Sequence, residues 1–126
     1  MQYMLLITDD PDFEPNADLV QAAADRDPDE PCWAPWAREV TARGIILKDG
    51  AQLSDAASAT TVAVRDGEVL LSDGPFAETK EQIVGYDVIE CENLDEAVYT
   101  ASRHPVALHG GRIEIRPIRA AGAASA

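Results

Sequence analysis

The chain has 126 residues, of which 46 % are hydrophobic and 26 % are charged, and this composition is typical of one globular domain. Its 23 acidic and 10 basic residues give a net charge of −13, which argues against nonspecific binding to nucleic acids or anionic membranes, because both need cationic patches. The first apolar run, Tyr3–Ile7, is far too short to span a bilayer, and no Lys or Arg precedes it as in a signal peptide. The two cysteines, Cys32 and Cys91, are far apart, so we predict reduced thiols in a cytoplasmic protein.

The N-terminal quarter combines an apolar run with an acidic stretch. Gln2–Thr8 is apolar and short, which predicts a strand that is central in a sheet or buried on both faces. Asp9–Glu30 contains nine acidic residues, one basic residue and three prolines. This composition predicts an extended loop with a short helical turn near Asp18–Ala24. We expect the acidic loop either to act as a solubilising surface or to bind a basic partner.

A helix is predicted over Cys32–Arg43, with Pro35 in its first turn and Gly44 as its stop. Its apolar stripe has the spacing i, i+3, i+4, i+7 and consists of Trp33, Trp36, Ala37 and Val40. A short strand at Ile45–Leu47 follows, and we expect Asp49-Gly50 to break it.

The clearest local signal is a β-hairpin, in which Thr60–Arg65 and Glu68–Ser72 flank the turn Asp66-Gly67. After the hairpin we predict a strand at Ile83–Glu92. A helix follows, which is capped by Asn93, with Glu96 three residues later as in a capping box, and which ends at Pro105. The chain closes with a strand at Arg112–Ile118 and a disordered tail at Ala120–Ala126.

This order of elements predicts an α+β, ferredoxin-like fold, a split βαβ arrangement with an inserted β-hairpin, in one domain over residues 1–119. Two helices cover only one face of such a sheet. We therefore expect a homodimer in which the second copy covers the other face.

One sequence block carries a family resemblance. Asp73–Tyr86 reads DGPFAETKEQIVGY, and it is accompanied by YMLLI at Tyr3–Ile7, ATTV at Ala59–Val62, NLDEA at Asn93–Ala97 and EIRPI at Glu114–Ile118. In these blocks the chain resembles the DGPF-domain subgroup of the YCII-related family, whereas Asp9–Pro31 does not match.

The resemblance implies a dimeric α+β barrel and a protein of uncharacterised activity. Many DGPF proteins are encoded beside extracytoplasmic-function sigma factors, which suggests a regulatory role. A more distant relative is a dehydrochlorinase of a hydroxylated aromatic ring, for which a His–Asp dyad with its His on the first helix has been proposed. Because Cys32–Arg43 contains no histidine, we do not expect this dyad to be inherited, and an Asp alone remains possible.

The candidate catalytic residues are accordingly Asp73, in the motif, and Asp9, at the end of the first strand. The candidate ligand-binding residues are Gly74, Pro75, Phe76, Lys80, Trp36 and Arg116. Each has a structural alternative: a turn for Asp73–Phe76, a solvated loop for Lys80, the core for Trp36 and an ion pair for Arg116. We interpret His104 and His109 as loop residues and expect neither a metal nor a cofactor.

Two functional hypotheses remain open. The first is a small-molecule-binding module with a regulatory use, with a sigma factor as a possible partner. The second is a cofactor-free lyase or isomerase that acts on a small organic acid or aromatic with an Asp as general base.

Overall fold

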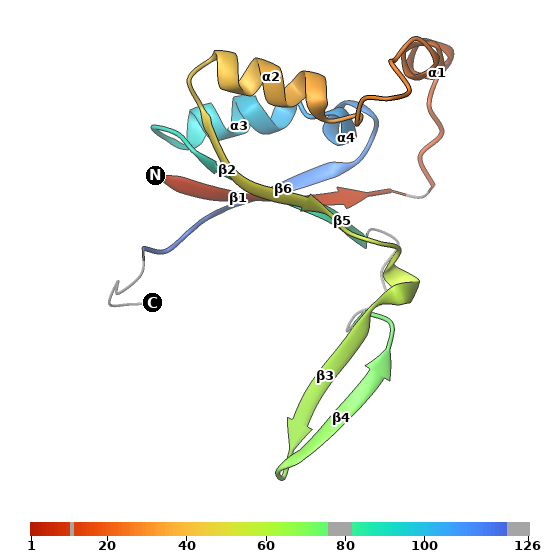
Figure 1. Cartoon of the computed structure of the whole chain (residues 1–126), viewed down its shortest axis with the longest axis vertical. Helices are drawn as coiled ribbons and strands as arrows, with labels where there is room; N and C mark the ends of the chain where they lie inside the picture. Colours follow the sequence, from red (N-terminus) through yellow and green to blue (C-terminus); the bar gives the residue numbers. More distant parts are fainter. Residues whose placement is uncertain (11, 76–81, 121–126) are drawn as a thin grey trace.

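The computed structural model describes residues 1–10, 12–75 and 82–120, and its framework is a four-stranded antiparallel sheet in the order β2-β5-β1-β6. The strands are β1 (Gln2–Asp9), β2 (Ile46–Gln52), β5 (Gln82–Glu90) and β6 (Arg112–Pro117). Three helices, α2 (Ala34–Ala42), α3 (Leu94–Ser102) and α4 (Pro105–Leu108), lie on one face of this sheet (Figure 1). The predicted α+β, ferredoxin-like fold is therefore confirmed.

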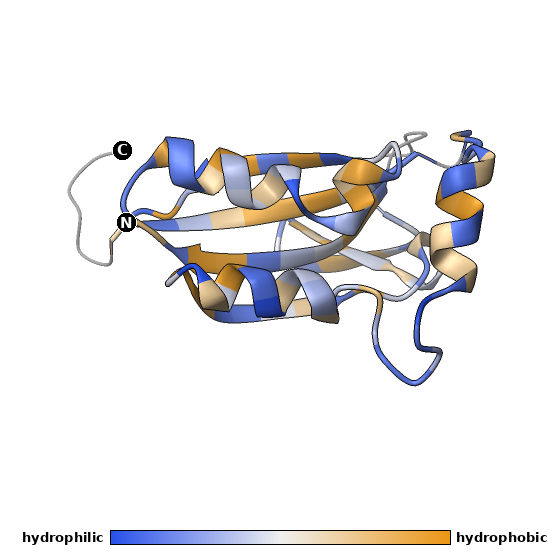
Figure 2. Cartoon of the chain, turned by 90° about the horizontal axis from the view of Figure 1, so that it is seen from above, coloured by the Kyte–Doolittle hydropathy of each residue, from blue (hydrophilic) through white to orange (hydrophobic). Residues whose placement is uncertain are grey.

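Strand β1 lies in the centre of the sheet, but its two faces differ in burial. Tyr3, Leu5 and Ile7 point to the helix layer and are buried, whereas the alternating Met4 and Leu6 are only half-buried on the opposite face. The apolar residues of the central strands can be followed beneath the helices in Figure 2. Of the two alternatives expected for this strand, the central position is therefore confirmed, whereas burial on both faces is not found in the single chain. We call the face without helices the open face of the sheet.

The two main helices pack through part of their predicted apolar stripes, because Trp33, Leu94 and Val98 are exposed. Trp36 and Val40 of α2 are buried, as are Ala97 and Ala101 of α3. Asn93 caps α3, because its side-chain oxygen accepts a hydrogen bond from the backbone N–H of Glu96 at 3.0 Å. Pro105, predicted as the residue that ends the preceding helix, is also the first residue of a short additional helix, α4.

Strand β2 runs through Asp49-Gly50, where the sequence predicted a break. The pairing of β2 with β5 shifts register between Leu47 and Asp49, and Gly50 then lies opposite Asp87. A β-bulge and a glycine are tolerated in this edge strand, so the Asp-Gly pair does not act as a turn here.

The hairpin of β3 (Thr60–Arg65) and β4 (Glu68–Asp73) forms as predicted, and both turn residues have positive φ, 52° at Asp66 and 79° at Gly67. It forms a separate two-stranded sheet that projects away from the helices (Figure 1).

The acidic stretch contains the predicted short helix, α1 (Ala17–Ala24), which has no buried residue. Within the part of the chain that the structure describes, no helix has the length and hydrophobicity needed to cross a membrane. The predicted tail lies mostly outside the described residues.

The two asparagine caps allow a matched test of this fold. Asn93 caps the packed helix α3, and Asn16 caps the exposed helix α1 with a hydrogen bond of the same length, 3.0 Å, to Leu19 N–H. We expect Asn93→Ala to lower the free energy of unfolding in urea by about 1 kcal/mol. Asn16→Ala should leave it unchanged, because α1 buries nothing. An equal loss in both variants would contradict this account of the core.

Candidate functional site

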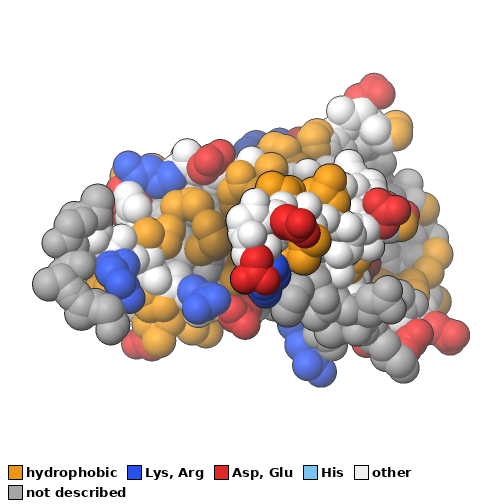
Figure 3. All heavy atoms as spheres, turned by 90° about the horizontal axis from the view of Figure 1, so that it is seen from below, with side chains coloured by type: hydrophobic (Ala, Val, Ile, Leu, Met, Phe, Trp, Pro, Cys, Tyr) orange, Lys and Arg blue, Asp and Glu red, His pale blue; other side chains and the backbone are white. Residues whose placement is uncertain are grey.

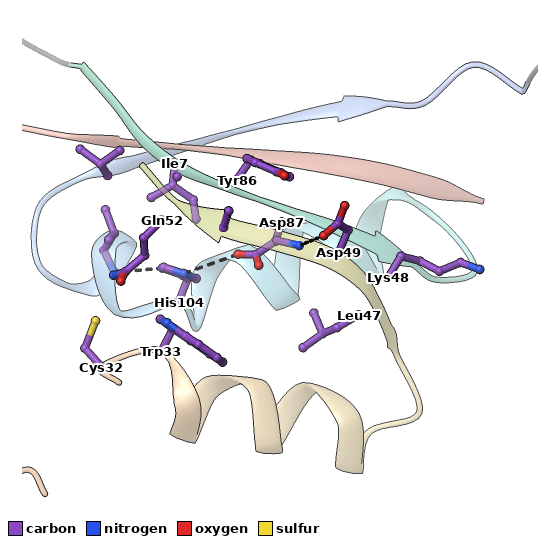
Figure 4. Close-up of a pocket in the computed structure, with 15 residues that line it drawn as sticks. Ile7, Cys32, Trp33, Leu47, Lys48, Asp49, Gln52, Tyr86, Asp87 and His104 are labelled. Carbon is purple, nitrogen blue, oxygen red and sulfur yellow. Dashed lines mark hydrogen bonds and ion pairs between the residues drawn. The ribbon is translucent and has the colours of Figure 1, made fainter. Parts of the chain in front are cut away.

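A cavity of about 380 Å³ opens between the helix layer and one end of the sheet. Strands β2 and β5 form its floor, and residues before α2 and around the start of α4 form its other walls (Figure 4). The apolar part of its lining includes Ile7, Trp33, Leu47, Val84 and Val106. A mostly apolar cavity with a few convergent polar groups is the usual form of a small-molecule site.

Two ionisable side chains face each other in this cavity. Nε2 of His104 lies 3.9 Å from an Oδ atom of Asp87 (Figure 4). The side chain of His104 is 5 % exposed and that of Asp87 is 21 % exposed. His104 lies in the connection between α3 and α4, as expected from the sequence, but it is buried and faces a carboxylate from β5, which its position in the sequence does not predict.

His104 is held in one orientation from two sides. Its Nδ1 accepts a hydrogen bond from the backbone N–H of Val106 at 3.1 Å, so that the side chain caps α4. The edge-to-face contact with Trp36, at 4.7 Å between ring centroids, holds the other side of the ring. Trp36 is itself fixed by its indole N–H, which donates to the carbonyl of Thr100 at 2.9 Å. Because Nδ1 accepts a hydrogen bond, the proton of the neutral ring is on Nε2, the atom that faces Asp87.

Asp87 owes its position to the glycine across the strand pair. It lies on β5 opposite Gly50 of β2, and a Cβ atom at Gly50 would clash with Oδ1 of Asp87. Gly85 permits a similar close approach, because a Cβ there would meet the carbonyl oxygen of Ala51 at 2.9 Å. The two glycines therefore let the strands approach and leave room for the carboxylate between β2 and the helix layer.

Burial shifts both groups toward their neutral forms. Desolvation raises the pKa of the Asp87 carboxyl to about 6 and lowers the pKa of the His104 imidazole to about 4. At pH 7 the pair therefore consists of a carboxylate and a neutral imidazole, and near pH 5 neither group is predominantly charged. The pair is thus a base beside a hydrogen-bond donor, not a salt bridge between two full charges.

The rim of the cavity adds one cation, one further carboxylate and a thiol. Lys48 forms an ion pair with Glu90 at 3.3 Å, and Asp49 accepts a hydrogen bond from the backbone N–H of Gly50 at 2.8 Å. Cys32 lies at the mouth beside Trp33 (Figure 4) and is a free thiol, as is the buried Cys91. Among the described residues, no group of three His, Cys, Asp or Glu is placed to bind a metal ion.

The residues singled out in the sequence lie elsewhere. Asp9 is exposed at the end of β1, and Asp73 is exposed at the end of the hairpin, with Gly74 and Pro75 directly after it. Arg116 is exposed on β6 and pairs with Glu114 at 3.7 Å. None of these residues lines the cavity. Trp36 does not line it either, but its ring contacts and positions that of His104. Phe76 and Lys80 lie outside the described residues.

A comparison with protein families identifies the family to which the chain belongs. The model of the YCII-related domain matches residues 1–121. The chain belongs to the YCII-related family. The resemblance found in the sequence is thereby confirmed at the level of the family.

A similar protein is an uncharacterized protein of Rhizobium meliloti (strain 1021), which is 39 % identical over 69 residues. The matched region is 54 % of this chain and 56 % of that protein, so the chain spans about half the length of the relative it matches. Family membership alone therefore does not specify the activity of this YCII-related chain, and the cavity is the feature that bears on it.

The role of Gly50 can be tested by a double-mutant cycle. We expect Gly50→Ala to lower the free energy of unfolding by about 1 to 3 kcal/mol, because the added methyl group displaces the Asp87 carboxylate. In an Asp87→Ala background the same change should be neutral or stabilising, since Ala is otherwise preferred to Gly in a strand. An equal loss in both backgrounds, measured by urea unfolding, would exclude the proposed contact.

The buried carboxylate should also reduce stability. Because its pKa is higher in the folded chain than in the unfolded chain, the destabilisation is absent below about pH 4 and complete above about pH 6. Asp87→Asn should therefore raise the free energy of unfolding at pH 8, by about 1 to 3 kcal/mol, and should give no gain at pH 4. Asp73→Asn, on the exposed hairpin, is the control and should follow the wild type at both pH values.

Proposed function

We propose that this YCII-related protein is a cofactor-independent enzyme that transfers a proton on a small organic molecule, as an isomerase or a lyase does. The observation that carries the proposal is the Asp87–His104 pair in an apolar cavity. A carboxylate in such a place is a stronger base than an exposed one, because burial has raised its pKa to about 6.

The two residues have complementary roles in this mechanism. Asp87 accepts a proton from a carbon of the substrate next to a carbonyl or phenolic group. The Nε2–H of His104 donates a hydrogen bond to the oxygen on which negative charge develops, and a neutral imidazole suits this task. Return of the proton to another carbon gives an isomerase, and departure of a leaving group gives a lyase.

The separation of the pair leaves both groups available to a molecule bound beside them. At 3.9 Å, Nε2 and Oδ are too far apart for a hydrogen bond to each other. Both groups therefore retain capacity for a bound molecule. The apolar lining favours a compact molecule with one polar end.

Proton transfer can be assayed before the substrate is known. We would incubate phenols, lactones and small carboxylates with the protein in D₂O and follow deuterium incorporation by mass spectrometry. We expect exchange into at least one compound, with a rate that rises with pH through about 6 because the base must be ionised.

The controls compare identical substitutions at sites inside and outside the cavity. Asp87→Asn should reduce the exchange rate by about 10² to 10⁴, the usual contribution of a general base. Asp73→Asn and Asp9→Asn should retain it, which also tests the two residues chosen from the sequence. Exchange that survives in Asp87→Asn would refute the proposal, and so would a compound that binds in the cavity with no exchange at any carbon.

A regulatory binding role is the second candidate, and the acidic stretch favours it. Helix α1 has no buried residue and carries Asp18 and the exposed Val20, a surface that a basic, partly apolar partner would fit. A sigma factor remains the partner suggested by the family resemblance. Salt-sensitive retention on an immobilised sigma factor, lost on deletion of Asp9–Glu30, would support this role.

A further inference from the structure

The Asp87–His104 pair presents a defined hydrogen-bond pattern to a molecule in the cavity. Nδ1 of His104 is occupied by the backbone N–H of Val106, so Nε2–H offers one donor, whereas the carboxylate of Asp87 offers acceptors only. The two facing atoms are 3.9 Å apart, which is too far for a bond between them but close enough for both to contact one functional group of a ligand. The pair is therefore complementary to an acceptor atom that has a hydrogen on the neighbouring atom.

Resting on the function proposed above, we infer that the substrate is an uncharged carbonyl compound, such as a ketone, a lactone or a lactam, and not an organic acid. The carbonyl oxygen of such a compound accepts the hydrogen bond from Nε2–H of His104, and its neighbouring C–H or N–H faces the carboxylate of Asp87. A carboxylate ligand instead presents two acceptors. One of them can meet Nε2–H, but the other then lies against Asp87, so that two negative charges share an apolar cavity.

Within the described part of the chain, no basic side chain is placed to offset this repulsion. Lys48 is the one cation among the described lining residues, and it is paired with Glu90 at 3.3 Å. Figure 4 shows its side chain directed away from Asp87 and His104. Several basic side chains instead lie on the open face of the sheet (Figure 3), where the register pairs Arg116 with Met4. The sheet itself separates those charges from the cavity.

The acidic stretch borders the same cavity and acts in the same direction. Its C-terminal end leads directly into Cys32 and Trp33, which line the mouth. Near its beginning, the ring of Phe13 lies against Gly110, where an added Cβ would collide with it. Between these two points, residues 14–30 include six acidic residues and one basic residue. Their electrostatic field opposes the approach of an anion and does not act on the net charge of an uncharged molecule.

Protonation of Asp87 should reverse this preference, because the protonated acid is a second donor beside Nε2–H and two donors match the two oxygens of a carboxylate. The pKa of Asp87 is raised to about 6 and that of His104 is lowered to about 4 by burial, so between pH 5 and pH 8 Asp87 is the member of the pair that changes its charge. The other titratable side chains among the described lining residues belong to the mouth, the rim or strand β5: Cys32, Lys48, Asp49 and Tyr86. Affinity for a carboxylate should therefore fall as the pH rises through about 6.

Benzamide and benzoate are suitable probes, because they have the same shape and differ in carrying an uncharged amide or a carboxylate. Neither has an acidic C–H, so they report recognition alone and leave the enzymatic function to the deuterium-exchange assay. By calorimetry at pH 8, we expect benzamide to bind at least about 10-fold more tightly than benzoate. Lowering the pH from 8 to 5 should tighten the binding of benzoate by up to about 100-fold, as expected for binding coupled to protonation of a group with a pKa of about 6. The affinity for benzamide should change by less than about 3-fold.

Asp87→Asn tests whether this residue carries the discrimination. The amide N–H of the asparagine is a donor at the place of the protonated acid, so the variant should bind benzoate at pH 8 as tightly as the wild type does at pH 5, and its affinity should not depend on pH. Asp73→Asn makes the same substitution on the exposed hairpin and should keep the pH response of the wild type.

Three results would overturn the inference: benzoate that binds as tightly as benzamide at pH 8, a pH response that survives in Asp87→Asn, or no binding of either probe at millimolar concentration. Deuterium exchange into a carboxylate compound at pH 8 would also overturn it, while upholding the enzymatic function. If the probes behave as expected but no compound exchanges deuterium, the enzymatic function is refuted and the recognition of uncharged carbonyl groups stands.

Discussion

The cavity depends on one constraint, namely that a carboxylate must fit between two paired strands and the helices above them. Asp87 meets this constraint because the residue opposite it is Gly50, where any side chain would collide with the carboxylate. The register of β2 against β5, including the shift between Leu47 and Asp49, is what brings that glycine into place. The pKa of about 6 follows from the same geometry, since the close approach that makes room for the carboxylate also removes water from it.

The imidazole that faces Asp87 is positioned by the helix layer in an equally indirect way. Thr100 of α3 accepts the indole N–H of Trp36, Trp36 lies against the ring of His104, and the ring accepts the N–H of Val106. The sheet thus fixes the base, and the packing of α2 on α3 fixes the hydrogen-bond donor. A site held by two separate layers is rigid only while the core between them is packed, which connects the chemistry of the cavity to burial of Leu5 and Ile89.

The sequence predicts the architecture because its signals are local. The Asp66-Gly67 turn, the Asn93 cap and the apolar stripe of Trp36 and Val40 each act over a few residues, and each appears in the structure as expected. The site could not be predicted in the same way. His104 and Asp87 are 17 positions apart in the chain and come together only through packing. In addition, Pro105 is typical of a helix end, so the sequence favours an exposed loop for the histidine before it. The Asp49-Gly50 pair was the one sequence feature that points to the site. However, a glycine that makes room for a carboxylate on the neighbouring strand cannot be distinguished in the sequence from a glycine in a turn.

The β3–β4 hairpin and the cavity are connected through the same two strands. The hairpin is inserted between β2 and β5, so the strand that carries Gly50 comes before it in the chain and the strand that carries Asp87 comes after it. The cavity lining includes Gln52 and Val84, which lie near the hairpin ends of these strands. At this end the two strands are joined by the hydrogen bond from the backbone N–H of Leu53 to the carbonyl of Val84 at 2.9 Å. The floor of the cavity therefore keeps its geometry only as far as these strand ends are held, and any contact that restrains the hairpin also acts on a site that needs fixed positions.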